Sequence, residues 1–119
     1  MKDKDTVTLY HNPRCSKSRQ TLELLEERNM TPNIVKYLET PPDAATLESI
    51  LDMLGREPRE LMRKGEVEYQ ELGLANSELS REQLIQAMVD NPRLIERPIV
   101  IKNGKAALGR PPERILDIL

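Results

Sequence analysis

The 119-residue sequence contains no Phe or Trp, three Tyr, one Cys and one His. Without Phe and Trp it lacks broad aromatic platforms on which single-stranded nucleic acid could stack, and its net charge of −2 favours no polyanion. One Cys cannot form an internal disulfide, and one Cys with one His offers too few soft ligands for a structural zinc site. We therefore expect no nucleic-acid partner and no bound metal.

Long apolar runs are also absent. No stretch approaches the length of a membrane-spanning helix, and the N-terminal MKDKD lacks the apolar region of a signal peptide. A single Cys fits a reducing compartment, so we expect a cytoplasmic protein that does not associate with a membrane. The length is that of one domain, and we predict a single domain over residues 1–119 and a monomer.

The pattern of apolar residues predicts the secondary structure. Alternating, β-branched residues 6–10 predict a strand, a helix follows from about 15 to 29, and residues 33–38 predict a second strand. Apolar residues at helical spacing predict a helical insert over residues 43–92.

A hairpin and a helix are predicted to complete the chain. Residues 99–101 form a compact apolar strand, Asn103-Gly104 is a strong hairpin signal, and residues 106–108 supply the return strand before a terminal helix that begins at Pro111. The order is β-α-β, helical insert, β-β-α. It predicts an α/β fold with a mixed four-stranded sheet flanked by helices.

Cys15 stands between the first predicted strand and the first predicted helix. At a helix N-terminus, unpaired backbone N–H groups and the positive end of the dipole favour a thiolate, and they can lower a thiol pKa from about 8.5 to below neutrality. Arg14, Lys17 and Arg19 add positive charge nearby. A lone Cys is more often a small buried apolar residue, but the strand–Pro–x–Cys–helix context favours a reactive thiolate.

Two polar residues near Cys15 are candidates to support that thiolate. Ser18, one helical turn further on, can donate its hydroxyl to the sulfur, and His11 can stabilise the loop or the thiolate. The alternatives are an ordinary helix cap for Ser18 and a hydrogen-bonded loop residue for His11.

Three arginines stand at the ends of predicted elements. Arg97 directly precedes Pro98 and a core strand, Arg110 directly precedes the terminal helix, and Arg63 ends a short helical segment. Guanidinium forks suit tetrahedral oxyanions, and helix N-termini bind anions. Each arginine alone is better explained by a surface ion pair, since the chain has 20 acidic residues. Together with the thiol they predict an anion site.

The segment HNPRCSKSRQT, residues 11–21, resembles the H-N-P-x-C-x-x-S-R-x-T motif of the glutaredoxin-coupled arsenate reductases. Further blocks follow in the family's order, so the resemblance covers essentially the whole chain. It implies a thioredoxin-like fold with a helical insert. These blocks are YLETPP at 37–42, ELMRK at 60–64, ELGL at 71–74, ERPIV at 96–100 and GRPPE at 109–113.

The resemblance also implies roles for individual residues. Cys15 matches the family's nucleophile, and His11 and Ser18 match positions that support its thiolate. Pro98 matches the cis-proline that faces the active-site Cys in thioredoxin-like folds, the alternative being a trans proline at a strand start. The oxyanion-binding set of the family is matched by Arg63, Arg97 and Arg110. The chain departs from better-known members at residues 16–17, where Ser-Lys replaces Gly-Thr.

The implied reaction is the reduction of arsenate to arsenite through an adduct on Cys15. Two electrons are needed and each thiol supplies one. The second thiol must come from outside because the chain has no other Cys. Glutathione is therefore expected as co-substrate and glutaredoxin as the partner that resolves the mixed disulfide, with no tightly bound cofactor.

Two other functions stay open. Spx-type regulators, which bind RNA polymerase, share the implied fold, although they usually carry Cys-x-x-Cys where this chain has Cys15 and Ser18. A glutathione-dependent disulfide or deglutathionylation catalyst would use the same thiol without an oxyanion.

Overall fold

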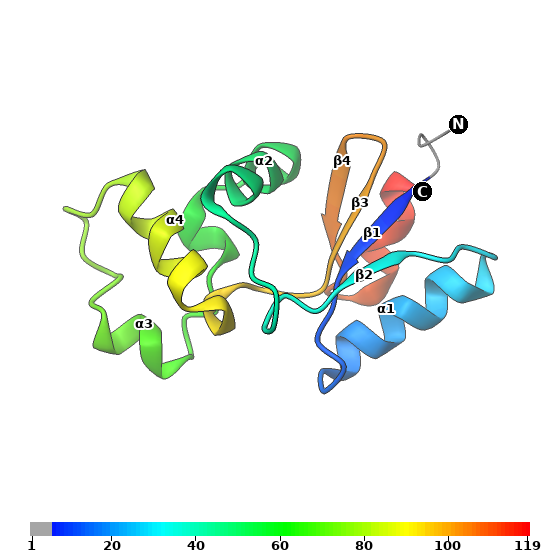
Figure 1. Cartoon of the computed structure of the whole chain (residues 1–119), viewed down its shortest axis with the longest axis horizontal. Helices are drawn as coiled ribbons and strands as arrows, with labels where there is room; N and C mark the ends of the chain where they lie inside the picture. Colours follow the sequence, from blue (N-terminus) through cyan, green and yellow to red (C-terminus); the bar gives the residue numbers. More distant parts are fainter. Residues whose placement is uncertain (1–5) are drawn as a thin grey trace. The chain divides into compact units, whose positions relative to one another are not determined.

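The computed structural model describes residues 6–119 (Figure 1). The N-terminal MKDKD segment lies outside the described residues. Two compact units make up the chain, and we name them the sheet unit (residues up to Thr40 together with Arg97–Leu119) and the helical unit (Pro41–Glu96).

The sheet unit contains the mixed four-stranded sheet that the sequence predicts. Its strand order is β2-β1-β3-β4, with β1 parallel to β2 and antiparallel to β3, and β3 antiparallel to β4. The α/β prediction is thus confirmed, and the parallel pair is the one joined by a helical crossover. The strands are β1 (Val7–Tyr10), β2 (Asn33–Val35), β3 (Ile99–Lys102) and β4 (Lys105–Leu108).

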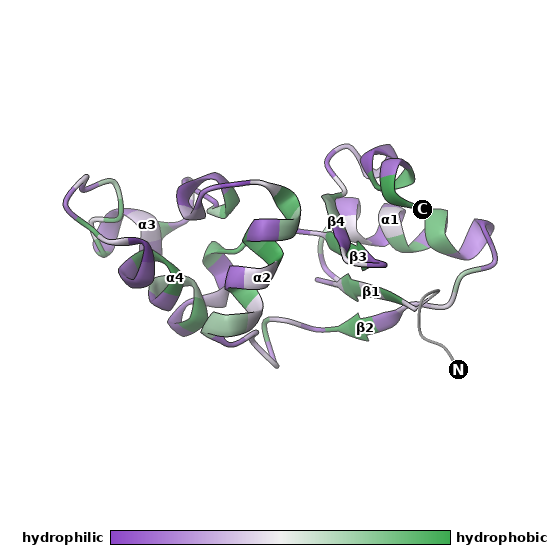
Figure 2. Cartoon of the chain, turned by 90° about the horizontal axis from the view of Figure 1, so that it is seen from above, coloured by the Kyte–Doolittle hydropathy of each residue, from purple (hydrophilic) through white to green (hydrophobic). Residues whose placement is uncertain are grey.

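Two helical segments cover the same side of this sheet: α1 (Ser16–Glu27) and the 3₁₀ segment η4 (Pro112–Ile118) (Figure 2). Alternate strand residues face them, because successive side chains of a strand point to opposite faces. The buried cluster between sheet and helices holds α1 in place, so that its N-terminus lies at the end of β1. Its members are Val7, Leu9, Leu25, Val100 and Ile115.

Two elements of this unit differ from the sequence prediction. β2 ends at Val35 rather than at residue 38, because the carbonyl of Lys36 accepts hydrogen bonds from the N–H groups of Glu39 and Thr40, both at 2.9 Å, and turns the chain. The last segment, η4, is a 3₁₀ helix and not an α-helix.

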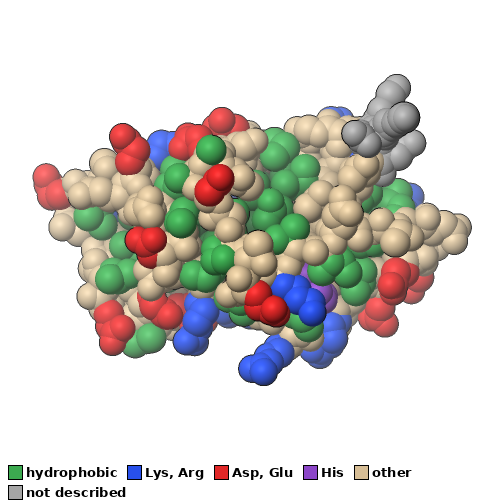
Figure 3. Space-filling model, viewed as in Figure 1, with side chains coloured by type: hydrophobic (Ala, Val, Ile, Leu, Met, Phe, Trp, Pro, Cys, Tyr) green, Lys and Arg blue, Asp and Glu red, His purple; other side chains and the backbone are tan. Residues whose placement is uncertain are grey.

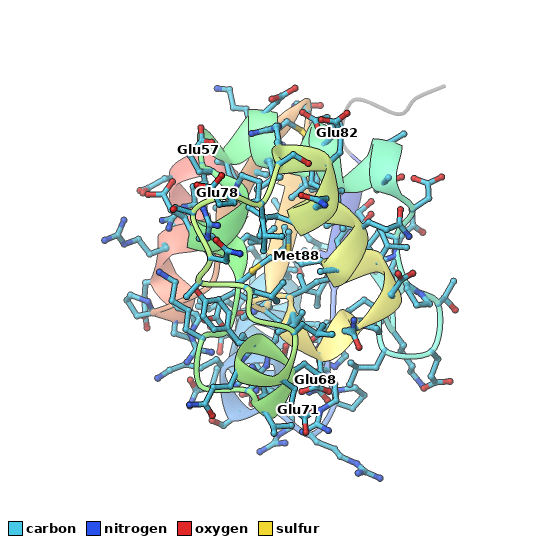
Figure 4. The ribbon with its side chains drawn as sticks, turned by 90° about the vertical axis from the view of Figure 1, so that its left-hand side faces the viewer. Glu57, Glu68, Glu71, Glu78, Glu82 and Met88 are labelled. Carbon is cyan, nitrogen blue, oxygen red and sulfur yellow. The ribbon has the colours of Figure 1, made fainter. Side chains whose placement is uncertain are left out.

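The helical unit is formed by short helices. Asp43 caps α2 by accepting the N–H of Thr46 at 2.8 Å, and Ser80 forms a capping box with Gln83 at the start of α4. Figure 4 shows Met88 among the side chains inside this unit, with Glu68 and Glu71 both coming from α3. The elements are α2 (Ala44–Leu54), η2 (Pro58–Leu61), α3 (Val67–Glu71), α4 (Arg81–Asp90) and η3 (Pro92–Leu94). Within residues 6–119, no helix is long and apolar enough to cross a membrane.

Gly109 lies where the sheet unit has no space for a larger residue. A Cβ there would sit 2.5 Å from Oγ1 of Thr21 and 2.8 Å from Cγ of Pro98. We expect Gly109→Ala to lower the free energy of unfolding by about 1–3 kcal/mol, the usual cost of overpacking, measured by urea denaturation. Gly65→Ala is the matched control, since a Cβ at Gly65 meets nothing within 4 Å. Equal stability of the two variants would contradict this close packing around Gly109.

Candidate active site

Cys15 is the N-cap residue of α1, at the junction of the β1–α1 loop and the helix. Its backbone N–H donates to the carbonyl of Asn12 at 3.0 Å, and its own carbonyl accepts the N–H of Arg19 at 3.0 Å. The side chain is buried, with 9% of its surface exposed. The sulfur therefore lies where the first turn of the helix leaves its N–H groups unpaired.

The surroundings of Cys15 favour the thiolate. Burial by itself raises the pKa of the thiol. The N–H of Ser18, the positive charge of Arg97, the N–H of Lys17 and a hydrogen bond from the Arg97 side chain lower it, and their combined effect holds the pKa below its ordinary value. The fraction of reactive thiolate near neutral pH is raised accordingly.

The groups that stabilise the thiolate differ in two respects from the sequence prediction. Ser18 acts through its backbone N–H rather than its hydroxyl, and the hydroxyl oxygen instead accepts the N–H of Asn12 at 3.2 Å. The positive charge comes from Arg97, a residue distant in the sequence, while Lys17 contributes its backbone N–H. The side chain of Arg19 donates to a backbone carbonyl of the loop, that of Pro13, at 2.9 Å.

Arg97 and Arg110 lie together in the sheet unit. Nη1 of Arg110 donates to the backbone carbonyl of Arg97 at 3.2 Å. The Arg97–Pro98 peptide bond is cis, as expected of Pro98, and the Arg110–Pro111 bond is cis as well, which was not expected. The structure thus brings Arg97 to the sulfur of Cys15 and Arg110 to the backbone of Arg97.

Arg63 belongs to the helical unit. Its Nη1 is 2.8 Å from Oε2 of Glu66, and its Nε is 3.6 Å from Oε1 of Glu96. Its backbone N–H donates to the carbonyl of Leu94 at 2.7 Å. The grouping of Arg63 with Cys15 stays a prediction.

His11 is buried, with 6% of its surface exposed, and its backbone N–H donates to the carbonyl of Val35 at 2.9 Å. Burial, followed by the positive charges of Lys36 and Arg19, lowers the pKa of its imidazole, which favours the uncharged ring. Nδ1 is buried and has no hydrogen-bond partner among the described residues. His11 is thus held in the loop by its backbone hydrogen bond to β2, in surroundings that disfavour a positive charge on the ring.

A cavity of about 230 Å³ opens beside the loop that leads to Cys15. Residues 11–14 line it together with Lys36, Leu38 and Glu39 from the turn after β2. In the space-filling view, basic side chains gather around the histidine (Figure 3). Sequence reasoning missed this cavity because its two segments are far apart in the chain. Within residues 6–119, no cluster of three His, Cys, Asp or Glu side chains could ligate a metal.

The thiolate can be measured directly. We expect the ultraviolet titration of Cys15, the only thiol of the chain, to give a midpoint below the ordinary value near 8.5, since the N–H groups of α1 and Arg97 favour the charged form. No other thiol contributes to the titration signal. The control is the same titration of the chain unfolded in denaturant. A midpoint equal to that of the unfolded chain would contradict the stabilisation of the thiolate by these groups.

Comparisons with known proteins agree with the family resemblance of the sequence. The model of the ArsC family matches residues 10–118. The chain is 63% identical to the uncharacterized protein YfgD of Escherichia coli over 114 residues, 95% of this chain and 96% of that protein. It is 51% identical to an arsenate reductase of Neisseria meningitidis over 114 residues, 95% and 97% of the two chains. The structure of an arsenate reductase from Vibrio cholerae superposes with a TM-score of 0.95 at 50% identity, covering 98% and 100% of the two chains. The thioredoxin-like fold expected from the sequence is thereby confirmed.

Proposed function

The chain belongs to the ArsC family, and on that premise we propose that it reduces arsenate to arsenite with Cys15 as the nucleophile. Two relatives that it matches over nearly their whole length, at 51% and 46% identity, are named arsenate reductases. The observation that carries the proposal is the environment of the sulfur. Cys15 caps α1, and the N–H groups of Ser18 and Lys17 act together with Arg97 to favour its thiolate.

In the first step the Cys15 thiolate attacks arsenic. A sulfur–arsenic bond forms and an oxygen leaves as hydroxide or water. Guanidinium groups stabilise the negative charge on the remaining oxygens, an electrostatic contribution that is often the largest in catalysis. Arg97 supplies this charge beside the sulfur, Arg110 lies at the backbone of Arg97, and the family resemblance adds Arg63.

In the second step a glutathione thiolate attacks the sulfur of Cys15. A disulfide bond forms, the sulfur–arsenic bond breaks, and its electron pair stays on arsenic, which leaves as arsenite. Each of the two sulfurs has then lost one electron and arsenic has gained two. Glutaredoxin reduces the mixed disulfide and restores the thiolate. The cycle needs reduced glutathione, so we place the protein in the cytoplasm, and it requires one copy of the chain and no tightly bound cofactor.

A coupled assay tests this function. Purified protein is mixed with glutathione, glutaredoxin, glutathione reductase and NADPH, and NADPH oxidation is followed on addition of arsenate. We expect turnover that requires arsenate and is lost when glutaredoxin is omitted. Absence of turnover in a folded protein, beside an active arsenate reductase as control, would refute the proposal. Turnover of a glutathionylated peptide without arsenate would instead support deglutathionylation.

A further inference from the structure

The cavity is lined by the loop residues that directly precede the nucleophile. Arg14, which lines it, immediately precedes Cys15 in the chain, so their Cα atoms are about 3.8 Å apart. His11 forms part of the wall and is held by its backbone hydrogen bond to β2. A molecule in this cavity would therefore lie beside the residue that directly precedes the nucleophile.

The charged side chains that line the cavity come from two segments, each held by a hydrogen bond of its backbone. Lys36 and Glu39 occupy the two ends of one turn, since the N–H of Glu39 donates to the carbonyl of Lys36 at 2.9 Å. The N–H of Arg14 donates to Oδ1 of Asn12 at 3.0 Å, which holds the loop opposite. The ion pairs of the described residues lie on other side chains. Two cations and one carboxylate are thus available to a ligand.

We propose that this cavity binds glutathione, with its carboxylates at Arg14 and Lys36 and its ammonium group at Glu39. Glutathione carries two carboxylates and one ammonium, which is the charge complement of this set of side chains. The inference rests on the proposed function, because it gives the thiol co-substrate of that reaction its place.

The size of the cavity agrees with partial enclosure of the ligand. Its volume of about 230 Å³ is below the range of roughly 300–1,000 Å³ that encloses a whole drug-sized molecule. It holds the charged backbone of the tripeptide, while the cysteine arm extends past Arg14 toward Cys15. The glutathione sulfur then approaches the sulfur that it must attack.

A reaction that needs no arsenate tests this site. The Cys15 thiolate attacks oxidised glutathione, forming one mixed disulfide and releasing one glutathione thiolate. Its rate is compared with the rate toward hydroxyethyl disulfide, which carries no charge. We expect Arg14→Gln and Lys36→Gln each to slow the reaction with oxidised glutathione by about fivefold, as for a partly exposed ion pair. Their rate with hydroxyethyl disulfide should change little.

The Glu39→Gln variant distinguishes a specific binding site from a nonspecific electrostatic attraction of the anionic disulfide. Removal of a negative charge would accelerate reaction with the anionic disulfide if only the electrostatic field mattered. A site that holds the ammonium group predicts slower reaction, again by about fivefold. Lys105→Gln, an exposed position on β4, is the control and should change the rate with oxidised glutathione less than the cavity variants do.

A binding measurement keeps the test independent of Cys15 reactivity. S-methylglutathione is titrated into the Cys15→Ser protein and followed by NMR, with the amide signals of residues 36–39 expected to shift. Rates that fall equally for both disulfides, faster reaction of Glu39→Gln, or no shift of these signals would each overturn the proposal. Because neither measurement contains arsenate, failure of arsenate turnover leaves both results interpretable.

Discussion

Replacement of Cys15 by Ser is expected to reduce arsenate-dependent turnover by about a thousandfold or more, to the background of the coupled assay. A serine hydroxyl is far less acidic than the thiol whose pKa is held low by α1 and Arg97. Its oxygen also cannot supply the electron that sulfur loses on forming a disulfide. The variant therefore loses both the nucleophile and the redox centre.

The fold is expected to survive this change. Cys15 is the N-cap of α1, and Ser is among the preferred N-cap residues. Urea unfolding should give a midpoint close to that of the wild type, which separates loss of chemistry from loss of structure. Turnover close to the wild-type rate in a folded Cys15→Ser protein would show that another group attacks arsenate.

Arg97→Ala is expected to lower kcat/KM for arsenate by about 10²–10³, the effect of removing one group that stabilises transition-state charge. Two losses combine in this variant. The pKa of Cys15 rises because a positive charge and a hydrogen bond to the sulfur disappear, and the oxyanion loses a guanidinium partner.

The pH profile separates the two losses. Arg97 lowers the pKa of Cys15, so without it a smaller fraction is thiolate at neutral pH and the fraction recovers as the pH rises. Activity regained at high pH measures the effect on the thiolate, and the remaining deficit measures oxyanion binding. Arg114→Ala, an exposed arginine on η4, is the matched control. Equal kinetics of the two variants would contradict the role of Arg97.

The fold could be predicted from local patterns to a large extent. The alternation in β1 and the Asn103-Gly104 turn between β3 and β4 are short-range signals, and both elements formed as expected. The end of β2 could not be predicted from such local patterns. Lys36 continues the strand-like pattern, but its carbonyl is used by the N–H groups of the following turn. Short elements such as α3 carry too few residues to show a period.

The candidate site was predictable where it depends on adjacent residues. The position of Cys15 at a helix start follows from the strand, the loop proline and the helical pattern behind it. The contact of Arg97 with the sulfur joins residues far apart in the chain. The positions of the arginines at element ends and the family resemblance predicted an anion site with the thiol, but not this contact. The cavity formed with Lys36 and Glu39 had no sequence signal, because a turn after an edge strand shows no periodicity.

The most direct test of the proposed mechanism is the mass of the intact protein after incubation with arsenate and glutathione in the absence of glutaredoxin. The proposed cycle stops there at the mixed disulfide, so each chain should gain one glutathione on Cys15 and release one arsenite. Without arsenate the mass should stay that of the free thiol. Arsenite formed without any adduct on Cys15, or an adduct that forms equally without arsenate, would contradict the central claim that the Cys15 thiolate carries arsenate reduction.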